Sequence, residues 1–407
     1  MTKRFIRPFE TGQIGLRLLA SEDLPTTLAW RNQDRVRKHF ISSRSLTPEE
    51  HRSWFESYAS KDDDFVFLFS DAHELSRPVG QISLYRIDWA RKTAEFGRLI
   101  VGEDQALHKG LARATTQLIL NLAFDYFKLQ SIILDVFESN DAAMAIYRAV
   151  GFTISSVRDG LVRMELNTDR YVRPTHSVIL GSYNRPTMVR KAVESVLHQT
   201  KTSFQLIITD DGSNEATLAS IRSMILGDSR CLLLHHDHQD DVLERRDCAN
   251  RAVQRINDAI SWVAGDIVHY LPDDDWYPRN RLEIFEDLFN DRDVVVGYGR
   301  LELVNAALDP VQSWYVPRVD DPLNVLDHKQ VAHRRLAFHQ IPQWPVATDW
   351  GSEGHFFRAL KAHWKFHGVD RIVAYHRWHD LNMQHTRESS TGMRESESRP
   401  RTHNTRH

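Results

Sequence analysis

Short apolar runs and amphipathic segments alternate along the chain, and their spacing predicts its secondary structure. Helical spacing covers 23–32, a long segment that ends near residue 127, and a short segment opened by Asn140. Another helix start is marked by Thr47 as N-cap, Pro48 in the first turn and Glu50 completing a capping box. The apolar runs favour strands at 14–19, 65–69, 79–85, 93–101 and 131–137. This mixture of helices and strands predicts an α+β domain in the first 168 residues.

From residue 175 onward, strands and helices alternate, which predicts a doubly wound, mostly parallel α/β sheet. The polar segment 169–174 separates this region from the first, so we expect two domains, at 1–168 and 175–386. Residues 387–407 lack core-forming side chains and are predicted to be disordered. The predicted elements are strands at 176–180, 204–209, 231–235 and 266–271 and helices at 188–199 and 241–263.

Length and composition limit the classes of protein that fit. The 407 residues are too many for one ordinary core and suggest two or three domains. Basic side chains number 52 and acidic ones 55, so the net charge of −3 does not indicate a nucleic-acid partner. No apolar run has the length of a membrane span or the form of a leader, and Cys231 and Cys248 fit packing thiols in a reducing compartment. We therefore expect a cytoplasmic protein.

The acidic triplet Asp273, Asp274 and Asp275 follows the buried-type strand at 266–271. Ligands of open α/β sheets bind outside the carboxyl ends of the strands, so the triplet lies where a site is expected. Neighbouring carboxylates repel each other, and a hard cation such as Mg²⁺ or Mn²⁺, bound to phosphate oxygens, would neutralise them. The alternative is a solvated acidic turn. In an extended segment, Asp273 and Asp275 would point to one side and Asp274 to the other.

A glycine turn joins the strand at 93–101 to the long helix that follows it. Gly110 and Ala112 lack bulk, so backbone N–H groups at the helix start can approach a pyrophosphate. The positive end of the helix dipole favours the same anion. This order of strand, glycine turn and helix predicts a site for a cofactor that contains a pyrophosphate.

Residues 13–167 resemble the GNAT superfamily of acyl-CoA-dependent N-acetyltransferases. The pyrophosphate loop of that family reads Arg/Gln-x-x-Gly-x-Gly/Ala, and this chain has Leu107-x-x-Gly110-x-Ala112, which departs at its first position. Asn140 and Tyr147 match later positions of the family. The resemblance implies an acetyl-CoA site formed by Val101, His108, Lys109, Gly110, Leu111, Ala112 and Asn140.

N-acetylation needs a base for the proton of the ammonium group and an acid for the thiolate that leaves. The resemblance implies that Tyr147 is the acid, and Glu95, on the strand that feeds the site, is the candidate base, directly or through water. The alternatives are a packed aromatic side chain and an exposed strand carboxylate. Residues 30–37 and 50–55 resemble the front segment of GNAT members that acetylate amino groups on nucleotide-linked sugars.

Residues 175 to about 380 resemble the family 2 inverting glycosyltransferases of GT-A fold, specifically the spore-coat polysaccharide type. The matching positions extend across this region and are 182–185, 209–215, 244–246, Arg251, 256–257, 273–275 and 352–357. The resemblance implies a nucleotide-sugar site that includes Gly181, Tyr183, Arg185, Asp211, Arg246 and Asp273.

The resemblance also implies a role for individual residues of the nucleotide site. Tyr183 would stack on a pyrimidine base, Asp211 would hydrogen-bond its ring nitrogen, and Arg246 would assist the nucleotide. Asp273 would lie near the ribose and the diphosphate. Gly181 stands where the relative has threonine.

The metal and the catalytic base have candidates of their own. The resemblance implies that Asp274 binds the metal ion. Asp275 stands where the relative has an amide residue, and it is a candidate for a supporting position at the metal site. An inverting displacement needs a carboxylate across the sugar from the diphosphate, which deprotonates the acceptor hydroxyl. Glu353 has the family position of this base, and Asp349 is the alternative. Histidines without metal-ligand spacing are expected to shape the acceptor cleft and the surface: His328, His333, His339, His376 and His379.

The two resemblances together predict a bifunctional enzyme. Its first domain would acetylate an amino sugar carried on UDP or dTDP. Its second domain would transfer that sugar, with a metal ion, to a glycan or lipid-linked glycan acceptor of a surface polysaccharide. The alternatives are a glycosyltransferase whose GNAT-like half only binds or assembles, and a non-catalytic sugar-binding scaffold.

Overall fold

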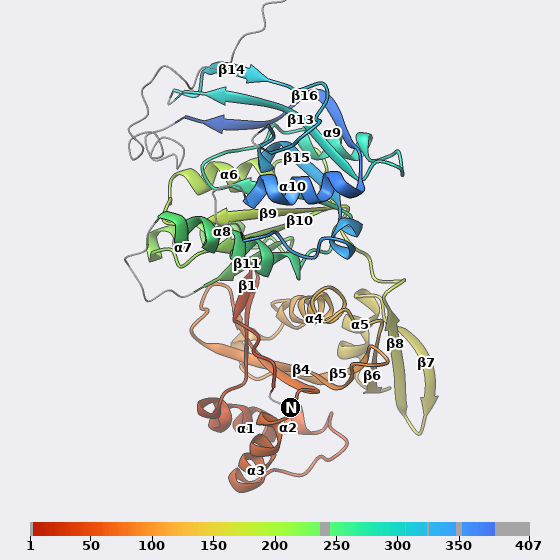
Figure 1. Cartoon of the computed structure of the whole chain (residues 1–407). Coiled ribbons are helices and arrows are strands. Elements are labelled where there is room, and N and C mark those ends of the chain that lie inside the picture. The colour runs from red at the N-terminus through yellow and green to blue at the C-terminus, as the bar shows by residue number, and fades with distance from the viewer. Residues whose placement is uncertain (1–2, 237–244, 306, 324, 347–351, 379–407) are drawn as a thin grey trace, which may run out of the picture.

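The chain folds into two α/β halves that are stacked on one another, as the computed structural model in Figure 1 shows. The structure describes residues 3–236, 245–305, 307–323, 325–346 and 352–378, and it describes the side chains of the helix at 245–260 from residue 250 onward. In these segments, no helix has both the length and the apolar character needed to cross a membrane. The predicted two-part α/β architecture is confirmed.

The N-terminal half is a mostly antiparallel sheet with helices on both faces (Figure 1). Its strands are β1 (Phe9–Thr11), β2 (Ile14–Leu18), β3 (Asp64–Asp71), β4 (Pro78–Asp88), β5 (Thr93–Val101), β6 (Ser131–Phe137), β7 (Thr153–Arg158) and β8 (Leu161–Asn167). Its helical segments are η1 (Ser21–Asp23), α1 (Leu24–Asn32), α2 (Asp34–Arg37), α3 (Pro48–Ala59), η2 (Asp104–Ala106), α4 (Leu111–Asn121), the π-helical η3 (Leu122–Tyr126) and α5 (Asp141–Ala149). The predicted capping box of α3 is confirmed, because Thr47 Oγ1 accepts from Glu50 N at 3.2 Å and Glu50 Oε2 accepts from Thr47 N at 2.9 Å.

The C-terminal half has a parallel centre with strand order β12-β9-β10-β11, and the predicted doubly wound arrangement is confirmed there. β15 extends it antiparallel to β12, and β13 pairs antiparallel with β15. Its strands are β9 (His176–Ser182), β10 (Phe204–Asp210), β11 (Cys231–His235), β12 (Ile267–Pro272), β13 (Val296–Val304), β14 (Pro310–Trp314), β15 (Val331–Arg334) and β16 (Phe366–Arg377). Its helical segments are α6 (Met188–Leu197), α7 (Glu215–Ile225), α8 (Arg245–Ile260), α9 (Arg281–Leu288), η4 (His328–Gln330), η5 (Arg335–His339) and α10 (Ser352–His363).

β1 joins the two halves into one sheet. Residues 10–11 of β1 pair antiparallel with residues 232–233 of β11, and residues 9–10 pair with residues 15–16 of β2. Throughout the described segments, the sixteen strands therefore form a single sheet. Sequence patterns did not predict this junction, because a strand of three residues is too short to show a period.

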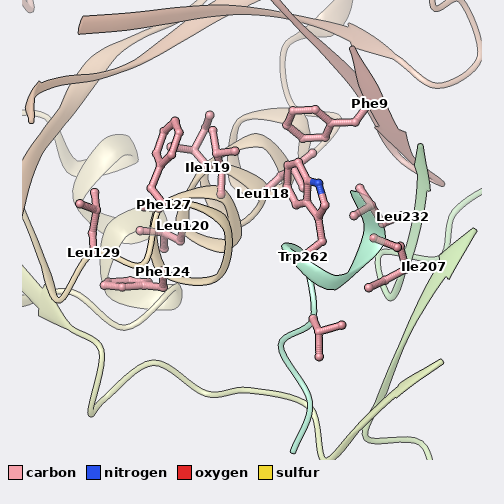
Figure 2. Close-up of a cluster of buried hydrophobic side chains, with 14 of the residues drawn as sticks. Phe9, Leu118, Ile119, Leu120, Phe124, Phe127, Leu129, Ile207, Leu232 and Trp262 are labelled. Atoms are coloured by element: carbon pink, nitrogen blue, oxygen red, sulfur yellow. The ribbon is translucent and has the colours of Figure 1, made fainter. Parts of the chain in front are cut away.

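The junction also has a hydrophobic core. Phe9 of β1 packs on Trp262, which follows α8, with 4.6 Å between ring centroids, and Trp262 lies 4.8 Å from Tyr126 of η3. Figure 2 shows Phe9 and Trp262 in this cluster, together with side chains of α4 and β11. Beside them, the buried Glu10 pairs with Arg222 of α7 at 2.9 Å. The two halves are therefore packed on each other.

The segment predicted as a linker is attached to the N-terminal half. β8 ends at Asn167 and β9 begins at His176. Between them, Arg173 pairs with the buried Asp125 at 3.0 Å, and the ring of Tyr171 lies 4.9 Å from that of Phe124. These contacts hold the connecting segment against η3.

Candidate functional site

A cleft of about 390 Å³ lies at the carboxyl ends of β9, β10 and β12. β9 lies between β12 and β10 in the sheet: the chain continues from β9 to β10 and β11 on one side and then crosses to β12 on the other side. Such a switch point is where open α/β sheets bind their ligands. Most of the residues predicted for a nucleotide sugar line this cleft: Gly181, Tyr183, Arg185, Asp211, Asp273, Asp274, Asp275 and Glu353.

The acidic triplet forms a turn that brings two carboxylates together. β12 ends at Pro272, and Asp275 N donates to Pro272 O at 3.4 Å. Nη1 of Arg185 donates to Asp273 Oδ1 and to Asp274 Oδ2, each at 2.8 Å. The alternation predicted for an extended segment is wrong here, because the turn places Asp273 and Asp274 beside the same guanidinium group.

Asp275 has a different environment from the other two acids. It is 1% exposed, and Lys329 Nζ lies 3.0 Å from its Oδ2. Arg377 N donates to its Oδ1 at 2.9 Å, and His376 Nδ1 lies 3.0 Å from the same atom. Protein groups thus occupy both oxygens and neutralise the charge. These contacts tie the turn to β16, and the part of Asp275 in the metal site stays a prediction.

Tyr183 presents an open ring beside two arginines of α8. It is 42% exposed, and the Arg251 guanidinium lies 5.4 Å from the ring centroid. Arg251 Nε and Arg255 Nε lie 3.2 Å and 3.1 Å from the two carboxylate oxygens of Asp211. A Cβ added to Gly181 would meet nothing within 4 Å. This wall of the cleft therefore offers an aromatic face, a fixed carboxylate and free space to a planar ligand.

Glu353 enters the cleft from the first turn of α10. Its Oε2 lies 2.6 Å from His328 Nδ1, which is also 3.3 Å from Asp327 Oδ1. These three side chains approach one another within 4.8 Å, a spacing that could also hold a metal ion. Asp349 and the side chain of Arg246 lie outside the described residues, so the choice between Glu353 and Asp349 stays a prediction.

The converging pair of carboxylates suits a divalent cation. Asp273 and Asp274 offer hard oxygen donors, which Mg²⁺ and Mn²⁺ prefer, and both already point to one positive group. Burial raises the pKa of Asp273; Arg185 opposes this effect and the charge of Asp274 adds to it. Asp273 is further held by Tyr183 N at 2.9 Å. Both carboxylates could therefore contribute to a cation site, and the assignment of the metal to Asp274 stays a prediction.

In the N-terminal half, β5 and β6 pair only near their starts. Residues 93–95 pair with residues 131–133, after which the two strands part. From β5 the chain enters a turn in which His108 and Gly110 have φ of 61° and 78°, and Gly110 is the N-cap of α4. A Cβ at Gly110 would meet nothing within 4 Å. The turn thus gives an anion open access to the N–H groups of a helix start.

The other residues predicted for the cofactor lie beside this turn, except Asn140, which lies at the start of α5. Val101 ends β5, and Leu111 and Ala112 begin α4. Lys109 pairs with Asp71 of β3 at 3.3 Å. Asn140 caps α5, where its side chain accepts from Ala143 N at 3.3 Å. Their contacts to a cofactor stay predictions.

Glu95 and Tyr147 occupy constrained positions. Arg86 Nη1 donates to both carboxylate oxygens of Glu95, at 2.9 Å and 3.0 Å. Tyr147 is buried and packs edge-on against Phe96, with 5.6 Å between centroids. Burial raises the pKa of the Tyr147 hydroxyl, so the phenol keeps the proton that an acid must donate. Tyr147 is thus packed among aromatic side chains, as its alternative role would have it. The catalytic roles of Tyr147 and Glu95 stay predictions.

Two family models match the chain in these same regions. The one described as Acetyltransferase (GNAT) domain matches residues 13–153, and the one described as Glycosyl transferase family 2 matches residues 177–306. The chain joins a GNAT acetyltransferase domain to a family 2 glycosyltransferase domain. Both are transferase domains, and both predicted resemblances are confirmed.

Several known proteins are similar to part of the chain. Protein CgeD of Bacillus subtilis is 33% identical over 171 residues, which are 40% of this chain and 39% of that protein. The UDP-Glc:alpha-D-GlcNAc-diphosphoundecaprenol beta-1,3-glucosyltransferase WfgD of Escherichia coli is 27% identical over 129 residues, 32% of this chain and 46% of that protein. The similarity thus spans less than half the length of these relatives. Among solved structures, apo FdhC, a nucleotide-linked sugar GNAT, is 17% identical, covers 40% of this chain and 92% of its own, and has a TM-score of 0.36.

The glycosyltransferase cleft contains residues that the sequence patterns did not single out. Arg255 lies four residues after Arg251, and that helical spacing was a usable signal for a shared face. Lys329 carried no such signal, since its partner Asp275 is far away in the sequence, and Asp327 joins the cleft through Lys329. Of the histidines predicted to shape the cleft and the surface, His328 and His376 line the cleft. His333 is buried and His339 is exposed. His379 lies outside the described residues.

Proposed function

We propose that the glycosyltransferase domain takes a UDP- or dTDP-linked sugar and transfers the sugar, with inversion, to a hydroxyl of a glycan or lipid-linked glycan. The observation that carries this proposal is the convergence of Asp273 and Asp274 on Arg185, in the same cleft as Glu353. The partial similarity to WfgD, whose name gives a UDP-sugar donor and a diphosphoundecaprenol-linked acceptor, supports the substrate classes.

In this reaction the acceptor oxygen attacks the anomeric carbon, and the bond from that carbon to the diphosphate breaks on the opposite side. Glu353 takes the proton of the acceptor hydroxyl as the new bond forms. Tyr183 and Asp211 bind the base, while Arg185 and Asp273 hold the end of the nucleotide next to the sugar. A divalent cation on Asp274 would offset the charge of the leaving nucleoside diphosphate.

Calorimetric titration of UDP and dTDP, with and without Mn²⁺, tests the metal-dependent site. Loss of a metal ligand in Asp274→Asn should weaken Mn²⁺-dependent binding by about 10-fold or more, since even residues that only support a ligand cost about that much. Asp370→Asn is the matched control, because Asp370 is an exposed carboxylate paired with Arg300 on the surface. Equal affinities of the wild type with and without Mn²⁺, or no binding of either nucleotide, would contradict the proposal.

We also propose that the GNAT domain uses acetyl-CoA to acetylate the amino group of an amino sugar on UDP or dTDP. The open turn before α4 and the parting of β5 and β6 support a CoA site, and the fusion to a glycosyltransferase supports a nucleotide-sugar substrate. The amine attacks the thioester carbonyl and the carbon–sulfur bond breaks. Glu95 removes the ammonium proton and Tyr147 protonates the thiolate. Both reactions belong to the cytoplasm in this proposal, which agrees with the buried free thiol of Cys231.

Release of the CoA thiol with a panel of UDP- and dTDP-amino sugars tests this second activity. Tyr147→Phe should lower kcat by about 100-fold, the usual contribution of a general acid. Tyr126→Phe removes a hydroxyl elsewhere in the same domain and should leave kcat unchanged. If no sugar of the panel supports thiol release, the proposed acetylation is wrong.

A second candidate is a GNAT domain that binds CoA without catalysis. The two hydrogen bonds from Arg86 to Glu95 favour it, because both carboxylate oxygens already have a partner that a substrate ammonium group would have to replace. Micromolar CoA binding without acetylation of any sugar would support this candidate, whereas turnover with one sugar would exclude it.

A further inference from the structure

A chain of charged side chains connects the acidic triplet with Glu353. Lys329 Nζ lies 3.0 Å from Asp275 Oδ2 and also pairs with Asp327. His328 Nδ1 then lies 3.3 Å from Asp327 Oδ1 and 2.6 Å from Glu353 Oε2. A capping box formed by Asp327 stiffens η4, the short helix that carries His328 and Lys329. The backbone that presents His328 is thus tied to the turn that presents the acidic triplet.

His328 has a defined orientation in this chain of contacts. Ionised carboxylates can only accept hydrogen bonds, so Nδ1 carries the proton that it shares with Glu353. The ring lies edge-on to the buried Trp344, with 6.2 Å between centroids. Burial disfavours the charged imidazole, but Asp327 and the hydrogen bond to Glu353 outweigh burial and raise the pKa of His328. The imidazole is therefore a fixed donor aimed at Glu353.

Glu353 needs such a donor if it is to act as a base. Its side chain is 37% exposed, and in the described part of the chain His328 supplies the hydrogen bond and ion pair recorded for it. An unheld glutamate keeps its rotamer freedom, and a reacting group displaced by about 1 Å can cost about 100-fold in rate.

We propose that His328 is a positioning residue for the glycosyl transfer, whose Nδ1–H holds the carboxylate of Glu353 in place to meet the acceptor hydroxyl. The inference rests on the proposed function of the cleft. It adds a residue that acts through Glu353, and it links the base to the acidic triplet through Asp327, Lys329 and Asp275.

Steady-state transfer kinetics of the full chain with Mn²⁺ test this role. His328→Ala should lower kcat by about 100-fold and leave the KM for the donor and the affinity for UDP unchanged. His328→Asn places an amide N–H near the position of Nδ1 and should recover about 10-fold of that loss. In a Glu353→Gln background, His328→Ala should cost nothing more, because His328 acts through Glu353. His339→Ala, at an exposed histidine, is the control and should match the wild type.

Several outcomes would overturn the inference. An unchanged kcat in His328→Ala is one, and a loss of UDP affinity as large as the loss of kcat, which indicates a general structural role, is another. A loss that excess Mn²⁺ restores would make His328 a metal ligand with Asp327 and Glu353.

If the wild type transfers no sugar, the proposed function fails. ¹⁵N NMR of the imidazole still shows whether His328 Nδ1–H donates to Glu353. A protonated Nδ1 in the wild type and a changed His328 signal in Glu353→Gln support the inference. An imidazole protonated only at Nε2, or a signal that Glu353→Gln leaves unchanged, overturns it.

Discussion

Replacement of Trp262 by alanine tests whether the two domains are one folding unit. Trp262 is 5% exposed, and its ring lies 4.6 Å from Phe9 and 4.8 Å from Tyr126 between centroids. Trp262 belongs to the glycosyltransferase domain and both partners belong to the GNAT domain. The substitution therefore empties the core at the junction without touching either proposed site.

The expected cost follows from the area that the indole buries. A buried tryptophan removes roughly 200 Å² from water, which at about 25 cal/mol per Å² is worth about 5 kcal/mol. Alanine keeps part of that area, so the free energy of unfolding should fall by about 3–5 kcal/mol. Because β1 continues the sheet of the glycosyltransferase domain, the loss should reach both domains. Phe9→Ala in the same background should show a coupling of about 0.5–1.5 kcal/mol.

Hydrogen exchange read by mass spectrometry reports on the two domains separately. Peptides of β3 and of β9 should lose protection together, by similar free energies, in Trp262→Ala. Trp314→Ala is the matched control, because Trp314 is 37% exposed on β14 and should change stability by less than about 1 kcal/mol. A loss of protection confined to one domain would refute the coupling through the junction.

Three further predictions concern stability. Asp275→Ala leaves the ammonium of Lys329, 3.0 Å away, without this buried partner, and urea unfolding should show a loss of about 3–5 kcal/mol; a loss under 1 kcal/mol would contradict the structural role of Asp275. Burial lowers the pKa of His333 to about 4. Between pH 6.5 and pH 4 the unfolded chain therefore binds more protons at this residue than the folded chain does. The stability present above pH 6.5 is lost, by up to about 3 kcal/mol, as the pH falls to 4. The unfolding free energy of His333→Gln should accordingly decline less between pH 6.5 and 4, and an equal decline would count against the buried neutral imidazole. Thr47→Ala removes the cap of α3 and should cost about 1 kcal/mol by thermal unfolding, whereas Ser43→Ala, outside any helix, should cost little.

Sequence patterns predict the elements whose own residues carry the signal. The runs at 93–101, 131–137 and 231–235 have the same bounds as β5, β6 and β11, because polar and glycine residues delimit each apolar run. The capping box at Thr47 is equally local. The position of the cleft was also predictable, because the carboxylates that follow β10 and β12 lie at the same edge of a parallel sheet.

What the patterns miss depends on contacts between distant segments. β1 is a strand because it pairs with the edges of β11 and β2, and a segment of three residues is too short to show a strand pattern. The acidic triplet turns, so the alternation of an extended strand fails for Asp273 and Asp274. Lys329, which pairs with Asp275, and His328, which pairs with Glu353, both come from η4, whose sequence shows no periodicity that would mark it.

Transfer of a labelled acetyl group through both domains is the most direct test of the central claim, that one chain acetylates a nucleotide-linked amino sugar and then transfers that sugar. Wild-type protein given [¹⁴C]acetyl-CoA, Mn²⁺, a UDP- or dTDP-amino sugar and a lipid-linked glycan should label first the nucleotide sugar and then the glycan. Asp274→Asn should stop at labelled nucleotide sugar, and Tyr147→Phe should yield little label in either product. Transfer of unlabelled sugar to the glycan, with no label on any nucleotide sugar, would contradict the claim.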